Sequence, residues 1–262
     1  MWNKNWILYT CLSSLAGLSG ILLLLENLKN SILPFLVIYS SIYLLYAGLT
    51  FILLKRKKIS ILPFIITSLV ICFFYYQIRP EISHDVFSYL MDGELISRGI
   101  NPYLVAPADP QLVEFQNSEL FTLNVWRDST TIYPPMSLTI FSLVYRMYEN
   151  FGIGGAKIIL SLPFFALAWL FYKFFDKKIF ALFILNPLIL FETFANGHVD
   201  IWTAFFVFVS LKLFFSNRIN FSSIFLTLSV LMKLIPAVIF PYILYNIFRK
   251  NKKKLYVRRK NA

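Results

Sequence analysis

The sequence has few charged residues for its length. Only 15% of its 262 residues are charged, against about 25% in an ordinary soluble domain. Apolar residues make up 58% and aromatic residues 18%, which excludes intrinsic disorder and collagen-like repeats. A chain with so few charges needs a lipid solvent, so the composition predicts an integral membrane protein.

Cysteine is also scarce. The two cysteines, Cys11 and Cys72, both lie in apolar runs, where packing is their expected role. This excludes a disulfide scaffold and argues against a cysteine-rich metal site. We expect no cofactor, and the sequence gives no indication of a divalent metal. With no internal repeat and no second soluble domain, residues 1–262 are predicted to form a single membrane domain.

Acidic residues are few and unevenly placed. Eight of the 13 lie between Arg79 and Thr131, with only three cations, whereas eight basic residues crowd into 249–260. Basic loops of membrane proteins stay in the cytoplasm. The pattern therefore predicts a basic cytoplasmic tail, 249–262, and an extracytoplasmic loop, 77–133. Because the tail follows an apolar segment, it favours contact with lipid headgroups over nucleic acid, and no nucleic-acid partner is expected.

Apolar runs of roughly 20 residues can cross a bilayer, and the sequence contains three such runs before the loop and five apolar segments after it. They are 6–25, 32–54, 59–76, 135–148, 155–175, 179–194, 201–215 and 221–248. The fold class predicted is an all-α polytopic membrane protein of about eight transmembrane helices. The basic cluster Lys55–Lys58 is placed in the cytoplasm, and the first span is expected to be an uncleaved helix.

Two topologies remain open after the loop. Counting each segment as one crossing puts the basic turn 176–178 outside, against the positive-inside rule. The alternative makes 135–148 a half-span and the last segment a bent helical pair, which puts that turn inside and Asn196–Asp200 outside. Under the strict count His198 faces the cytoplasm, away from the loop.

The loop contains a predicted amphipathic helix from Glu81 to Gly99. Its apolar residues recur at helical spacing, at Val86, Phe87, Leu90, Met91 and Leu95. The helix is expected to lie on the outer membrane surface with its acids, Asp85 and Asp92 among them, facing water.

Polar groups at or within apolar spans are expensive and are therefore functional candidates. Five clusters qualify: His84-Asp85 with Tyr89, Gly99–Tyr103, Tyr133-Pro134-Pro135, Asn196–Asp200 after Asn186-Pro187, and Lys233–Pro236. Each also has a structural interpretation, as a helix cap, a turn or a snorkelling lysine. Together, a surface carboxylate, a histidine at a helix terminus and a lysine at a helix break suit a lipid-linked phosphate.

The order of HDVFSYLMDGELISRGINPY, TIYPP, NPLILFETFANGHVD and LMKLIPAVIFP resembles the GT-C superfamily of integral-membrane glycosyltransferases, in particular the polyprenyl-phosphate-mannose-dependent mannosyltransferases. The resemblance implies that Asp85 is the catalytic base of an inverting transfer. The substrate-binding residues that we expect are His84, Tyr89, Asp92, Arg98, Asn101, Tyr103, Tyr133, Asn196, His198, Asp200 and Lys233. One departure is that Asp85 follows His84 where some members have a second adjacent carboxylate.

The function implied is transfer of a hexose, expected to be mannose, from a polyprenyl-phosphate donor to a glycan or lipid acceptor. The site is expected on the extracytoplasmic side of a bacterial plasma membrane. Family members usually continue for several more spans, so the chain is interpreted as a minimal member, a truncated product, or one part of an assembly with a partner membrane subunit. The alternatives are a non-enzymatic lipid or solute transporter and a catalytically inactive partner subunit.

Overall fold

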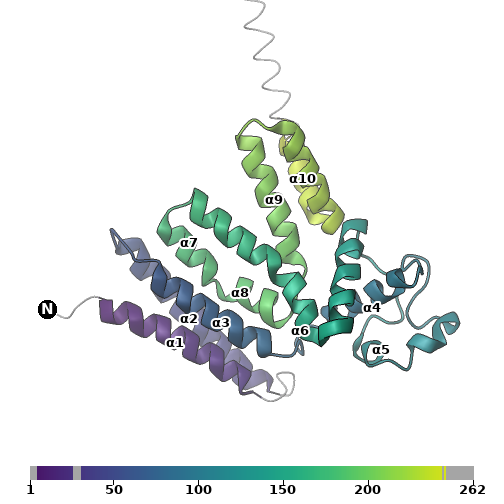
Figure 1. Cartoon of the computed structure of the whole chain (residues 1–262). Helices are drawn as coiled ribbons and strands as arrows, with labels where there is room; N and C mark the ends of the chain where they lie inside the picture. The colour runs from purple at the N-terminus through teal and green to yellow at the C-terminus, as the bar shows by residue number, and fades with distance from the viewer. Residues whose placement is uncertain (1–4, 26–30, 244, 246–262) are drawn as a thin grey trace, which may run out of the picture. The chain divides into compact units, whose positions relative to one another are not determined.

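The computed structural model describes residues 5–25, 31–243 and 245, and over these residues the chain is helical with no strand (Figure 1). This confirms the all-α prediction. The chain divides into two compact units. The first comprises residues 1–132 and 138–201, and the second residues 133–137 and 202–262. The predicted basic tail, 249–262, lies outside the described residues, and the single membrane domain stays a prediction.

Three apolar helices open the first unit: α1 (Asn5–Leu23), α2 (Ile32–Lys55) and α3 (Leu62–Gln77). α1 packs against both α2 and α3. Its buried residues Leu8, Leu12 and Leu15 recur at helical spacing, while Ile7 and Ile21 on other sides of the helix are exposed. Apolar side chains on both the packed and the open sides are typical of helices surrounded by lipid.

Three of the described helices are long and apolar enough to cross a membrane: α1, α2 and α6 (Pro135–Phe174). A fourth candidate joins α7 (Lys177–Ile184) to the segment Pro187–Ala195 across a 45° bend. The structure thus confirms several membrane-length helices, and the number eight stays a prediction.

α6 contains one non-helical residue, Gly152, with φ 62° and ψ −158°. Glycine adopts this left-handed φ without the steric cost that a side chain brings. The following Gly155 lies so close to the Met147 carbonyl that a Cβ there would collide with it. Two helical segments therefore meet in a tight turn, which confirms the prediction of separate apolar segments at 135–148 and 155–175.

The loop between α3 and α6 contains α4 (Asp85–Ser97), a 3-10 turn at Pro110–Phe115 and α5 (Glu119–Leu123). The predicted apolar face of α4 is buried, and Leu95 packs with Leu112 and Phe115. The expectation that the acids of this helix face water is wrong for Asp92, which is 4% exposed, because residues returning from the end of the loop cover it.

The basic segments of the first unit gather at one end. Arg56 donates a hydrogen bond to the Asn5 side chain at 2.8 Å, and the Lys178 ammonium donates to the Leu54 carbonyl at 3.4 Å. The turn 176–178 therefore lies beside the Lys55–Lys58 cluster. This proximity favours the topology in which both basic segments share one side of the membrane.

The second unit consists mainly of α9 (Asp200–Phe215), α10 (Ile219–Met232) and a 3-10 turn, Ile235–Ile239. The Ser210 hydroxyl donates to the Ser222 carbonyl at 2.8 Å and joins α9 to α10. Ser137 donates to the Met232 carbonyl, which fixes the end of α10 against the start of α6. α10 ends at Met232, and the next residue, Lys233, has an extended backbone ahead of Pro236.

Candidate active site

The N-terminus of α4 forms one side of the site. Asp85 is the first residue of the helix, and its backbone N–H donates to the Ser83 hydroxyl at 3.4 Å. A carboxylate in the first helical turn is stabilised by the helix dipole. The Asp85 side chain is 36% exposed, so an incoming substrate can reach it.

The chain from Asn186 to Asp200 forms the other side. The Asn186 side chain accepts from the Ile189 N–H at 3.2 Å and caps α8 (Pro187–Leu190), which runs into a π-helical turn, Phe191–Ala195. Such turns occur frequently at functional sites. Gly197, with φ +70°, then reverses the chain so that the His198 N–H donates to the Glu192 carbonyl at 2.8 Å.

His198 connects the two sides. Its Nδ1 lies 3.1 Å from Glu192 Oε2, its Nε2 lies 2.7 Å from Ser83 Oγ, and the same Nε2 lies 3.8 Å from Asp85 Oδ2. Asp85 and His198, both predicted as site residues, therefore lie at the same end of the first unit. This contact argues against the topology in which every apolar segment crosses the membrane once, because that topology puts Asp85 and His198 on opposite sides.

Glu192 also accepts a hydrogen bond from Asn196 Nδ2, at 2.9 Å. Asn196 is 3% exposed, so this bond holds the carboxylate from the buried side. The contact of Nδ1 with Glu192 fixes the ring so that Nε2 points toward Ser83 Oγ and Asp85 Oδ2. The arrangement orients His198 and leaves the Asp85 carboxylate open to substrate.

His84 has the N-cap position of α4, and its ring packs 6.0 Å from the Phe87 ring. Neither of its buried ring nitrogens has a hydrogen-bond partner within the described residues. Buried polar atoms in native proteins are nearly always paired, so each exception needs an explanation. His84 stays a predicted substrate-binding residue.

The remaining predicted residues of the loop make internal contacts. Tyr89 is buried and stacks on Phe141 at 4.4 Å. Arg98 pairs with Glu94 at 3.0 Å, and Asn101 Oδ1 accepts from the Tyr103 N–H at 3.0 Å to close a turn. The Tyr103 side chain is exposed. Their substrate-binding roles stay predictions.

Asp92 lies two turns along α4 from Asp85. Thr131 donates its hydroxyl to Asp92 Oδ2 at 2.6 Å, which ties the end of the loop to the helix. Burial raises the pKa of Asp92 to about 7. Asp200 opens α9 and is exposed. Tyr133 and Lys233 belong to the second unit, so their part in the same site also stays a prediction.

Sequence reasoning missed Glu192, Ser83 and Lys157. Lys157 is 1% exposed, and its ammonium donates to the carbonyls of Tyr76 at 3.2 Å and Ile78 at 2.5 Å. These contacts anchor the C-terminal end of α3, from which the chain runs to Asp85. Lys157 and Glu192 could have been found from the sequence, because each is a charged residue within an apolar segment. Ser83 carried no such signal.

No group of three or more His, Cys, Asp or Glu side chains within the described ranges is placed to hold a metal ion. Fold and site define a helical membrane protein in which a carboxylate at the start of a loop helix lies beside a histidine from a distant turn of the chain.

Residues 36–249 match the model of the MptA_B family, described as alpha-(1->6)-mannopyranosyltransferase, N-terminal domain, and the chain belongs to this family. It is 25% identical over 178 residues to alpha-(1->6)-mannopyranosyltransferase A of Corynebacterium glutamicum, covering 63% of this chain and 35% of that protein. The chain thus spans about a third of the relative's length. No solved structure matches. The family match confirms the predicted resemblance to the mannosyltransferases.

Proposed function

We propose that the protein transfers a mannosyl group from a polyprenyl-phosphate donor to a glycan or lipid acceptor outside the cytoplasm, as a GT-C-type enzyme with inversion at the anomeric carbon. The family supports mannosyl transfer. The observation that carries the mechanism is the approach of His198 Nε2 to Asp85 Oδ2, at 3.8 Å, beside two further polar groups.

Asp85 is the general base. Its carboxylate accepts the proton of the acceptor hydroxyl as that oxygen attacks the anomeric carbon of the donor. The bond between that carbon and the phosphate oxygen breaks, and polyprenyl phosphate leaves with both bonding electrons. The 36% exposure of the Asp85 side chain allows the acceptor to approach, and no nucleophilic residue is required.

In its protonated form His198 donates Nε2–H to the leaving phosphate and stabilises the negative charge that develops there. Glu192 is a positioning residue because it binds Nδ1 and fixes the direction of Nε2. Lys233 is proposed as the second phosphate contact. His84, Tyr89, Asp92, Arg98, Asn101, Tyr103, Tyr133, Asn196 and Asp200 are proposed to bind donor or acceptor.

The membrane arrangement is part of the proposal. The end of the first unit with Asn5, Arg56 and Lys178 is strongly basic and is assigned to the cytoplasm. The site residues Asp85 and His198 are then extracytoplasmic. The protein is proposed to be a polytopic protein of the bacterial plasma membrane that takes its lipid-linked donor on that side. The predicted loop, 77–133, lies on the same side as the site.

The direct test is mannosyl transfer in membranes that contain the protein, compared with membranes that lack it. Radiolabelled mannose is supplied on polyprenyl phosphate in one arm and on a nucleotide in the other. We expect label in an extracytoplasmic product only from the polyprenyl-phosphate donor. Label from the nucleotide donor alone contradicts the proposed donor, and passage of the lipid or sugar across the membrane without transfer supports a transporter.

A further inference from the structure

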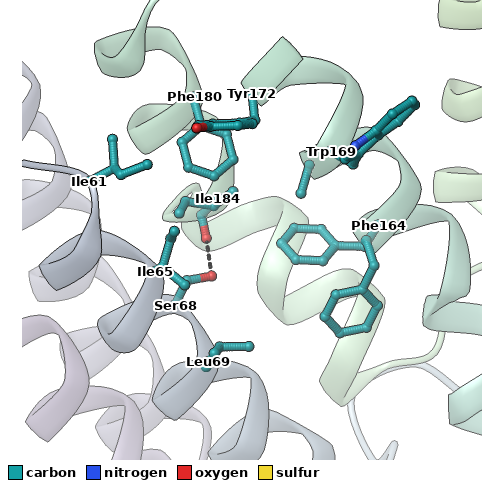
Figure 2. Close-up of a pocket in the computed structure, with 11 residues that line it drawn as sticks. Ile61, Ile65, Ser68, Leu69, Phe164, Trp169, Tyr172, Phe180 and Ile184 are labelled. Atoms are coloured by element: carbon teal, nitrogen blue, oxygen red, sulfur yellow. Dashed lines mark hydrogen bonds between the residues drawn. The ribbon is translucent and has the colours of Figure 1, made fainter.

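An apolar pocket lies between α3, α6 and α7 of the first unit, away from the polar residues around Asp85 (Figure 2). Its volume is about 370 Å³, within the range of about 300–1,000 Å³ found for ligand pockets. The lining residues are almost all aliphatic or aromatic. The hydroxyl of Ser68 donates to the Ile184 carbonyl at 2.6 Å, so this group is used inside the fold. The walls therefore suit an apolar chain.

The pocket opens toward the surroundings of the protein. Leu69, Trp169 and Tyr172 in its wall are each more than half exposed, at 53%, 58% and 53%. Figure 2 shows Phe180 and Tyr172 toward one end and Leu69 toward the other. Aromatic side chains with a polar tip, such as Tyr172, favour the boundary between hydrocarbon and headgroups. The Phe180 end is thus the headgroup end.

Two lysines lie close in the chain to the residues of that end: Lys173 follows Tyr172, and Lys177 comes three residues before Phe180. The Lys173 ammonium lies 5.0 Å from the centre of the Trp169 ring, and the exposed Lys177 begins α7, which also carries Phe180. The acid of this turn, Asp176, accepts hydrogen bonds from the backbone N–H groups of residues 178 and 179 at 2.7 and 3.0 Å. Its carboxylate is thus engaged in capping α7. An apolar pocket with a positive rim complements a lipid with a negative headgroup.

We propose that this pocket binds a phospholipid with an anionic headgroup, one acyl chain in the pocket and the phosphate against Lys173 and Lys177. Lipid tails gain little by leaving other tails for an apolar protein surface. The preference among lipids must therefore come from the lysines, at about fivefold for each basic residue. With the sidedness of the proposed function, the headgroup end of the pocket lies in the cytoplasmic leaflet; that placement rests on the proposed function, whereas the pocket and its charge do not.

The test is native mass spectrometry of the full-length chain released from nanodiscs of equal phosphatidylglycerol and phosphatidylcholine. We expect wild type to retain phosphatidylglycerol about 25-fold over phosphatidylcholine, at about fivefold for each of the two lysines. Lys173→Ala with Lys177→Ala should remove that preference, and Ala168→Phe, which fills the pocket, should lower retention of both lipids. Lys55→Ala is the matched control, since Lys55 is an exposed lysine with the same kind of aromatic contact, 3.8 Å from the Phe51 ring.

Equal retention of the two lipids by wild type would overturn the inference. Undiminished retention of phosphatidylglycerol by Ala168→Phe would also overturn it. So would a lipid-free dimer in which a second copy of the chain covers this face. Retention is measured without any mannosyl donor. A protein that binds the lipid but transfers no mannose contradicts the proposed function alone, and one that transfers mannose without lipid preference contradicts this inference alone.

Discussion

The buried carboxyl group of Asp92 predicts an unusual dependence of stability on pH. The side chain is 4% exposed, and burial raises its pKa from 3.8 to about 7. Between these two values the folded protein keeps the proton while the unfolded chain has lost it. Stability from this group is therefore fully present below pH 3.8 and falls as the pH rises toward 7. Asp92→Asn, which has nearly the same shape and no charge, should remove the fall.

The size of the effect follows from the shift. At about 1.4 kcal/mol for each pKa unit, a rise of about three units corresponds to about 4 kcal/mol as an upper value. For a chain of this length that is a change in melting temperature on the order of 10 °C. Asp92→Asn should therefore melt close to wild type at pH 4 and well above it at pH 8.

The assay is thermal unfolding of the detergent-solubilised protein across pH 4 to 8. Glu114→Gln is the matched control, because Glu114 is an exposed acid of the same loop and its loss should leave the wild-type slope unchanged. If Asp92→Asn and wild type show the same slope, Asp92 is not a buried, protonated acid and the reasoning is refuted.

Two further substitutions test the site and its support. Glu192→Gln should lower mannosyl transfer about 10- to 100-fold by loosening His198, measured at equal expression. Glu149→Gln, on the exposed side of α6, is the control and should leave transfer unchanged. Equal activity of the Glu192 and Glu149 variants would contradict the positioning role of Glu192. Gly93→Ala should lower stability by about 1–3 kcal/mol, because a Cβ there would collide with the Phe141 carbonyl. Gly48 has open space around it in α2, so Gly48→Ala should unfold no earlier than wild type. An equally small loss of stability in both variants would contradict the close packing of α4 on α6.

Local patterns in the sequence predicted the helices well. The spacing of Val86, Leu90 and their neighbours predicted α4, and the break between two apolar segments corresponds to Gly152. The basic turn 176–178 conflicted with a simple count of spans, and its contact with Leu54 shows which topology the packing favours. These features depend on periodicity and charge, which are properties of short stretches.

Features that depend on distant residues could not be predicted. Asp92 was expected to face water, yet Thr131, 39 residues later, binds and helps to cover it. The pairing of Asp85 with His198 spans 113 positions of the chain, so spacing alone gave no sign of it. Glu192 lay within a motif that the sequence had already singled out, but its role became visible only when the π-helical turn brought it to His198.

The central claim is that Asp85 is the base of a mannosyl transfer. The measurement is transfer of radiolabelled mannose from polyprenyl phosphate in membranes with equal amounts of wild type and Asp85→Asn. We expect transfer by wild type and a loss of at least about 100-fold in the variant. Full activity of Asp85→Asn would contradict the assignment of the base, and no transfer by wild type from any polyprenyl-phosphate sugar would contradict the proposed function.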